Sequence, residues 1–166
     1  MTPFRAVRRA CVCLCSMSLL MLTGCSTPGT KPTEASPFWS GRLGLQVQTS
    51  PPQSWSASFE LSGSAEQGQM RLFSPVGTTL ARLRWTPQTA LLEQGQSQTE
   101  SDNLQSLIQR LTGTDLPMSA LFAWLAGRTS DVPGWQVDLS AHPQGRLTAK
   151  RTFPAPEAVL RIVIDP

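Results

Sequence analysis

Apolar and polar residues alternate with a period of two through several short segments of this chain, and this alternation restricts the fold more than any other feature. Between Gly41 and Gln48, the residues Leu43, Leu45 and Val47 alternate with polar or small ones. The pattern returns between Trp55 and Leu61, after a Ser-Pro-Pro-Gln turn. Because successive side chains of a strand point to opposite faces, both segments are predicted to be strands with one buried face. They are expected to form an antiparallel hairpin.

Further strands are predicted on both sides of a helical region. Short segments with strand-type composition are separated by turns that contain Gly, Pro or Ser. Four of them precede the helices and three follow: residues 69–74, 79–85, 90–94 and 96–100, then 135–139, 146–151 and 159–165. An antiparallel meander is the simplest way to connect the first group.

Two helices are predicted between the two groups of strands. The first has apolar residues at i, i+3, i+4 and i+7, a cap at Ser101 or Asp102, and a stop at Gly113. The second has Pro117 in its first turn and ends before Gly127. Their apolar faces consist of Leu104, Leu107, Ile108 and Leu111 in the first helix and Met118, Leu121, Phe122 and Leu125 in the second.

This order of elements predicts an α+β fold with an antiparallel sheet, because helices between two batches of antiparallel strands do not build a parallel sheet. Eight or nine strands offer an apolar face that two short helices cover only in part. One interpretation is a curved, half-open β-barrel with helices covering a hydrophobic cavity. The other is a sheet that closes on its helices with no space left. The sequence leaves both open.

The N-terminus has the features of a secretion signal. Arg5, Arg8 and Arg9 precede an apolar run from Ala10 to Met21, and small residues lead into Cys25. The run is shorter than the roughly 18 apolar residues of a transmembrane helix, so a signal peptide at residues 1–24 is the better interpretation. Residues 25–37, rich in Pro, Thr, Ser and Gly, are predicted to be a flexible tether, and residues 38–166 one domain.

Removal of the signal changes two properties of the chain. Cys11, Cys13 and Cys15 leave with it, so no disulfide framework or cysteine metal site is expected. The 14 basic residues lose three and the 11 acidic residues lose none, which leaves 11 of each. Since the mature chain is then near neutral, no binding to nucleic acid is predicted.

The sequence Leu22-Thr23-Gly24-Cys25 resembles the lipobox of bacterial lipoproteins. This resemblance implies that Cys25 receives a covalent diacylglycerol and an N-acyl chain after cleavage and that no other cofactor is needed. The alternative is a plain signal peptide followed by an ordinary cysteine. Ser26 stands where Asp would retain a lipoprotein in the inner membrane, so the resemblance implies an outer-membrane location facing the periplasm.

Several segments of the remaining chain resemble the LolB family of outer-membrane lipoprotein receptors in their order and spacing. They are Phe38–Leu43, Ser74–Leu83, Leu111–Gly113, Leu116-Pro117, Trp124–Arg128 and Leu160–Asp165. The resemblance implies a monomer that accepts acylated lipoproteins from the periplasmic carrier LolA and inserts them into the inner leaflet of the outer membrane. An enzyme is not expected. The alternative is an anchored envelope lipoprotein with a structural or protein-binding role and no lipid cavity.

The resemblance also assigns a membrane-insertion loop to Pro75, Val76 and Gly77. Family members place a protruding apolar residue, usually Leu, between the Pro and the Gly, and this chain has Val76 there. The shorter side chain loses about 0.8 kcal/mol of membrane affinity. The alternative is a type I turn in which Val76 has no function.

Eleven apolar residues are predicted to line an acyl-chain cavity, although each could equally belong to an ordinary core. They are Leu43, Leu45, Trp55, Phe59, Met70, Leu72, Leu107, Phe122, Leu125, Leu160 and Ile162.

The remaining candidates offer little chemistry. His142, the single histidine, is interpreted as a surface residue, because it lacks the partners of a metal site or a catalytic triad. Arg42, Arg82, Arg84 and Arg128 could meet an acidic rim on the carrier, or they could be solvated residues on the outer faces of strands.

Overall fold

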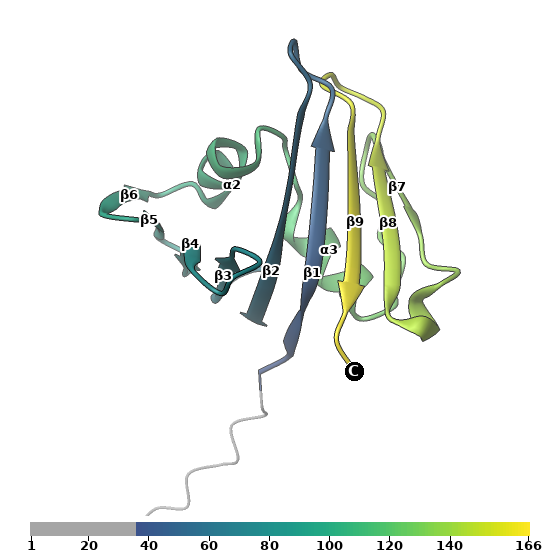
Figure 1. Ribbon diagram of the computed structural model, residues 1–166, viewed down its shortest axis with the longest axis horizontal. Coiled ribbons are helices and arrows are strands. Elements are labelled where there is room, and N and C mark those ends of the chain that lie inside the picture. The colour runs from purple at the N-terminus through teal and green to yellow at the C-terminus, as the bar shows by residue number, and fades with distance from the viewer. Residues whose placement is uncertain (1–35) are drawn as a thin grey trace, which may run out of the picture. The chain divides into compact units, whose positions relative to one another are not determined.

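Nine antiparallel strands form one sheet in the part of the chain that the computed structural model describes, residues 36–166 (Figure 1). The predicted signal, Cys25 and nearly all of the tether lie outside these residues. The strands are β1 (Phe38–Val47), β2 (Gln53–Gly63), β3 (Gly68–Phe73), β4 (Thr79–Trp85), β5 (Ala90–Gln94), β6 (Ser97–Ser101), β7 (Trp135–Asp138), β8 (Arg146–Arg151) and β9 (Ala158–Ile164).

The sheet is open at both edges. Its strand order is β6-β5-β4-β3-β2-β1-β9-β8-β7, so the first six strands form a meander and β9 pairs with the free side of β1. Among the described residues, the edge strands β6 and β7 do not pair with each other. In Figure 1 the sheet curls around the helices instead of closing into a barrel. This arrangement confirms the prediction of an α+β fold with an antiparallel, half-open β-barrel.

The period-two pattern predicted the buried face correctly. In β1 the side chains of Leu43, Leu45 and Val47 are buried, and the residues between them are exposed or half-buried. The predicted bounds of β4, β5 and β8 agree with the structure, and those of the other strands differ by a few residues at the ends. Alternation was reliable where a strand buries one face and exposes the other, which is true of all the strands except the edge strand β6.

Two helices lie on the concave side of the sheet, α2 (Leu104–Thr112) and α3 (Met118–Leu125), and a 3-10 helix, η1 (His142–Gln144), precedes β8. The predicted cap of α2 was wrong: the Asn103 side chain accepts from the Ser106 N–H at 3.2 Å. The hydroxyl of Ser101 instead accepts from the N–H of Asn103, one step before the helix. Gly113 ends α2 in the left-handed conformation, as predicted.

The two helices differ in how deeply they are buried. α3 was predicted to have one apolar stripe, but Ala120 and Trp124 on its other side are buried too. The reason is that β7 covers this side of the helix: the rings of Trp124 and Trp135 lie 5.7 Å apart. Pro117 lies at the N-cap of α3, not inside its first turn. α2, in contrast, buries only one face and exposes Ser106, Gln109 and Arg110.

Gly41 allows β1 and β9 to approach each other closely. A Cβ atom at this position would lie 2.0 Å from the carbonyl oxygen of Val163, a distance that real Cβ contacts do not reach. The backbone of Gly41 also has φ +156°. A side chain would therefore push apart the two strands that join the halves of the sheet.

We expect Gly41→Ala to lower the free energy of unfolding by about 2 kcal/mol, because the added methyl group meets backbone that cannot rotate away. Urea denaturation of the purified domain measures this loss. Gly44→Ala is the control on the same strand, since nothing lies within 4 Å of its added Cβ atom. Equal stability of the two variants would contradict the steric argument.

Buried tryptophans of the core differ in their hydrogen bonds. Trp85 donates from Nε1 to the carbonyl of Ser64 at 3.0 Å, and Trp135 donates to the carbonyl of Asp115 at 3.1 Å. Nε1 of Trp124 is buried without a partner among the described residues. An unpaired buried donor reduces stability, whereas a paired one adds to it.

We therefore expect Trp135→Phe to destabilise the domain by about 1–2 kcal/mol more than Trp124→Phe does. Both changes remove similar volume, but only the first leaves a backbone carbonyl without its donor. Thermal unfolding followed by circular dichroism compares the two variants. A larger loss of stability in Trp124→Phe would mean that packing outweighs the hydrogen bond here.

Candidate functional site

A short loop between β3 and β4 presents an aliphatic side chain to solvent. The N–H of Gly77 donates to the carbonyl of Ser74 at 2.9 Å, which closes a turn with Pro75 and Val76 at its centre. Ser74 also exchanges hydrogen bonds with Thr78 through its N–H and its hydroxyl. Val76 is 88% exposed at the tip. The loop is thus a hydrogen-bonded turn that carries a protruding apolar residue.

A β-bulge follows this loop in β4. Phe73 is opposite Thr79 and Leu72 is opposite Ala81, so Leu80 is an extra residue with no partner on β3. Bulges commonly redirect a side chain. Alternation would place Leu80 on the outer face with Arg82, and Leu80 does line a hollow there with Arg82 and Glu93. It also lines a groove together with the inward-facing Leu72 and Ala81. Its side chain is 45% exposed.

This groove is small, apolar and open to solvent. Its volume is about 210 Å³, and it lies where the end of α2 meets strands β2, β3 and β4. Its lining residues are Trp55, Ser56, Ala57, Leu72, Leu80, Ala81, Gln94 and Leu111. Pockets that enclose small ligands are typically about 300–1,000 Å³. The groove is therefore smaller than a pocket that would enclose a whole ligand.

A larger hollow of about 550 Å³ lies between the starts of α2 and α3. It is wide open, and about half of its lining is polar, from Asp102, Asn103, Gln105 and Ser119. A hydrocarbon chain gains little from such surroundings, because only apolar contacts remove it from water. We therefore regard the smaller, apolar groove as the better candidate for lipid contact.

The eleven predicted cavity residues belong to the protein's own core. Ten are buried and Trp55 is half-buried, in one cluster with residues of both helices. Of the eleven, Trp55 and Leu72 line the groove. The groove residues Ala57, Leu80, Ala81 and Leu111 were not among them. Ala57 of β2 and Ala81 of β4 occupy inward positions in the alternation of their strands, so the sequence pattern could have identified both. The position of Leu80 depends on the bulge.

Two side chains on the inner face of β7 and β8 hold the connection between α2 and α3. Arg151, only 6% exposed, donates to the hydroxyl of Thr114 at 2.8 Å. Its cross-strand partner Trp135 donates to the carbonyl of Asp115 in the same connection. Sequence reasoning missed this anchor, although Arg151 continues the inward positions of Leu147 and Ala149.

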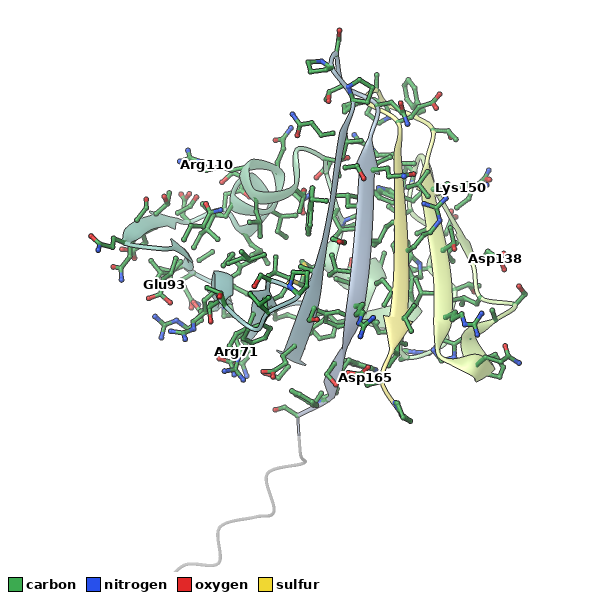
Figure 2. The ribbon with its side chains drawn as sticks, in the orientation of Figure 1. Arg71, Glu93, Arg110, Asp138, Lys150 and Asp165 are labelled. Carbon is green, nitrogen blue, oxygen red and sulfur yellow. The ribbon has the colours of Figure 1, made fainter. Side chains whose placement is uncertain are left out.

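The arginines considered for a carrier interface do not gather in one place. Arg82 and Arg84 on β4 both face Glu93 on β5, at 3.5 and 3.3 Å. Glu93 lies with them on the outer side of the sheet (Figure 2). Arg42 is on β1 and Arg128 follows α3, and both are exposed. For Arg82 and Arg84 these ion pairs favour the interpretation as solvated residues on the outer face of a strand.

His142 is half-buried, and its interpretation as a surface residue was wrong. Its Nε2 lies 3.0 Å from the carbonyl oxygen of Leu125 near the end of α3. Since a carbonyl only accepts, Nε2 carries the hydrogen. Gly127 makes room for the ring, because a Cβ atom there would lie 2.8 Å from Cε1 of His142. The histidine therefore satisfies a helix-terminal carbonyl, which is a structural role.

Residues 36–166 contain neither a metal-binding cluster nor a membrane-spanning helix. No group of three or more His, Cys, Asp or Glu side chains is arranged to hold a metal ion in this part of the chain. Within the same residues, no helix combines the length and the apolar character needed to cross a membrane.

The fold and the groove define a class of protein: a half-open β-barrel with helices on its concave side and an apolar groove beside a protruding loop. Residues 38–155 match the family model described as "Outer membrane lipoprotein LolB". The chain therefore belongs to the LolB family of outer membrane lipoproteins. This result confirms the family predicted from the sequence motifs and agrees with the expected outer-membrane location.

Curated relatives carry the same description, "Outer-membrane lipoprotein LolB". A protein from Shewanella baltica (strain OS223) is 29% identical over 155 residues, which cover 86% of this chain and 70% of the relative. A protein from Shewanella sp. (strain MR-4) is 30% identical over 127 residues, which cover 70% of this chain and 58% of the relative. One from Vibrio cholerae serotype O1 is 28% identical over 137 residues, or 73% and 64%.

Proposed function

We propose that this protein accepts acylated lipoproteins from a LolA-like periplasmic carrier and inserts them into the inner leaflet of the outer membrane. Membership in the LolB family supports a role as an outer-membrane lipoprotein receptor. The observation that carries the finer proposal is the apolar groove between α2 and the curled strands, with Leu80 at its rim. In this proposal an acyl chain first contacts the groove and then enters the core beneath α2.

The core is filled in this structure, so an acyl chain must displace part of the protein. α2 is the element suited to move, because one of its faces is exposed and its apolar face contains only four residues. Leu107 and Ile108 are buried, and Leu104 and Leu111 are half-buried. Exposing these side chains costs about 4–9 kcal/mol, at about 1.5–3 kcal/mol for a fully buried one.

An acyl chain can offset this cost. Each buried methylene contributes about 0.8 kcal/mol, so a chain of about sixteen carbons gains on the order of 12 kcal/mol by leaving water. Burial of one chain in place of the α2 side chains is therefore favourable. α3 is not a candidate for this movement, since nearly all of its residues are buried.

Passage of the cargo between two proteins needs no nucleotide hydrolysis. Moving an acyl chain from one apolar interior to another leaves the buried apolar area nearly unchanged. A difference of about 1.4 kcal/mol between carrier and receptor then gives a tenfold preference for the receptor. Lipid attachment at Cys25 would keep the receptor at the membrane where the cargo is released.

Transfer from a loaded carrier tests the proposal. A LolA-like carrier with a labelled lipoprotein is mixed with the purified protein, and the distribution of the label is measured by separation of the two. We expect the label to move to this protein as its concentration rises. Retention of all cargo on the carrier over a wide range of concentrations would contradict the receptor function.

The filled core also favours a second candidate, an anchored lipoprotein that binds a protein partner and takes up no lipid. A solvatochromic dye distinguishes the two functions. A receptor is expected to bind the dye and to release it when a fatty acid is added. A purely structural lipoprotein would leave the dye in water at all concentrations of protein.

A further inference from the structure

Three adjacent strands carry four cations on the convex face of the sheet. Arg42 of β1, Val163 of β9 and Arg146 of β8 lie opposite one another in a single cross-strand row. Arg161 lies in the next row, between Gly44 and Thr148, and Lys150 lies in the row after that. We call the surface formed by Arg42, Arg146, Arg161, Lys150 and Val163 the basic face.

The side chains of the basic face are available to a partner. All four cations are exposed, and Val163 between two of them is 48% exposed although it is aliphatic. None of the four cations belongs to an ion pair found within residues 36–166. Arg161 donates a hydrogen bond to the neutral side chain of Gln46 at 3.1 Å.

Carboxylates lie only at the margin of this surface among the described residues. Asp138 belongs to the edge strand β7, where it lies opposite Thr148 of β8, and Asp165 follows β9 and accepts from the hydroxyl of Ser40. Hydrogen bonds from the hydroxyl and then the N–H of Ser140 hold the pKa of Asp138 below its ordinary value. Glu60 on β2 is engaged by Arg71.

The charge of the basic face is a local concentration and not a property of the whole domain. Residues 36–166 contain ten Lys or Arg and ten Asp or Glu residues, so their net charge is zero. The outward positions of β1, β9 and β8 nevertheless hold four cations and no carboxylate. Like charges so close together repel one another, and a bound anionic surface would relieve this repulsion.

We propose that the basic face docks the domain on a phospholipid bilayer that contains anionic headgroups. Arg and Lys form charge-assisted hydrogen bonds with phosphate, and the exposed Val163 can contact the interface between them. The proposal depends on the membrane location that family membership supports. It does not require that the protein binds acyl chains.

The composition of the basic face favours a lipid surface over a protein partner. The centres of protein interfaces are enriched in aromatic residues, Met and Arg and depleted of Lys, so the three arginines suit either kind of partner and the distinguishing features are Lys150 and the lack of an aromatic residue. The outward positions of these three strands contain Lys150 and no Trp, Tyr or Met within the rows described above. Gly44 and Thr148 are small, so the long cationic side chains can extend toward a flat layer of headgroups.

The basic face also lies near the place where the chain leaves the domain toward its N-terminus. Arg42 is four residues from Phe38 at the start of β1, a distance of about 13 Å along a strand. Phe38 is 60% exposed. The start of β1 and the end of β9 lie at the same end of the sheet in Figure 1.

Vesicle sedimentation tests the proposal without carrier or cargo. The chain from Ser26 to Pro166, which contains the whole compact unit 35–166, is mixed with vesicles of phosphatidylcholine, with or without phosphatidylglycerol. We expect binding only with phosphatidylglycerol, and weaker binding as salt is added. The triple variant Arg42→Gln, Arg146→Gln, Arg161→Gln should lose at least tenfold in partitioning, because each cation near an anionic surface contributes to binding.

A second triple variant with the same change in net charge is the control. Arg84→Gln, Arg110→Gln and Arg128→Gln remove three exposed cations outside the basic face, and Figure 2 shows Arg110 on the outer side of α2. We expect this control to bind vesicles nearly as the original chain does. Equal binding by both triple variants, or equal binding to both kinds of vesicle, would overturn the proposal.

The vesicle-binding experiment can fail or succeed independently of the cargo-transfer test. If the basic face is instead a docking site for an acidic protein, the first triple variant will lose binding to a LolA-like carrier and keep its binding to vesicles. That result would also overturn the lipid assignment. Failure of cargo transfer with intact vesicle binding would contradict the receptor function alone.

Discussion

Leu80→Glu is expected to weaken the uptake of acyl chains about a hundredfold while the fold remains intact. Leu80 is 45% exposed, so a polar side chain of similar size is tolerated there. Its position at the rim of the groove means that a carboxylate would have to lose water as an acyl chain enters. The lost apolar contact and the desolvation of the charge together cost about 3 kcal/mol.

Dye displacement by a fatty acid and cargo transfer from a carrier both measure this loss. Leu91→Glu is the matched control, because Leu91 is a half-buried leucine on the outer positions of β5 and does not line the groove. Leu80→Met should retain uptake, since it keeps an apolar side chain of similar volume. Undiminished uptake by Leu80→Glu would show that acyl chains reach the interior by another route.

Val76→Glu is expected to produce the opposite defect, with normal uptake of cargo and release into vesicles reduced about a hundredfold. Val76 is 88% exposed at the tip of its loop and lines neither the groove nor the larger hollow between α2 and α3, so its replacement leaves the groove unchanged. A carboxylate in place of an apolar tip costs about 3 kcal/mol if the tip must enter hydrocarbon.

Release is measured by flotation of labelled cargo with liposomes after it has been loaded onto the variant. Gln96→Glu, in the exposed turn between β5 and β6, is a control for the added charge. Val76→Leu adds a methylene, about 0.8 kcal/mol, and should increase release by about fourfold. Release by Val76→Glu at the original rate would leave the segment Pro75–Gly77 as an ordinary turn.

Leu80→Glu and Val76→Glu together separate cargo uptake from cargo insertion. Both introduce a glutamate, one in β4 at the rim of the groove and the other four residues earlier, in the loop before β4. Thr79 begins the strand, and Leu80, the extra residue of the bulge, lies at the rim of the groove. If both variants lost uptake, the loop and the groove would form one surface for the acyl chain. If neither variant lost cargo uptake or release, the apolar side chains at the groove rim and the loop tip would have no role in transport.

The sequence by itself determined the strands, their buried faces and the two helices. Period-two alternation depends only on the burial of one face of a strand, and this condition holds for every strand except β6, none of whose residues is buried. The stop of α2 at Gly113 was likewise predictable, because a left-handed C-cap is a local requirement for glycine. The turn at Pro75–Gly77 also follows from local residue preferences.

Only the tertiary structure decided which apolar residues are core and which reach the surface. The position of Leu80 depends on the register between β3 and β4, and the burial of Trp124 depends on its packing against Trp135 of β7. The contact between Arg151 and Thr114 joins residues 37 positions apart. Local patterns contain no information on such pairings, because they depend on how distant segments are brought together when the sheet curls around its helices.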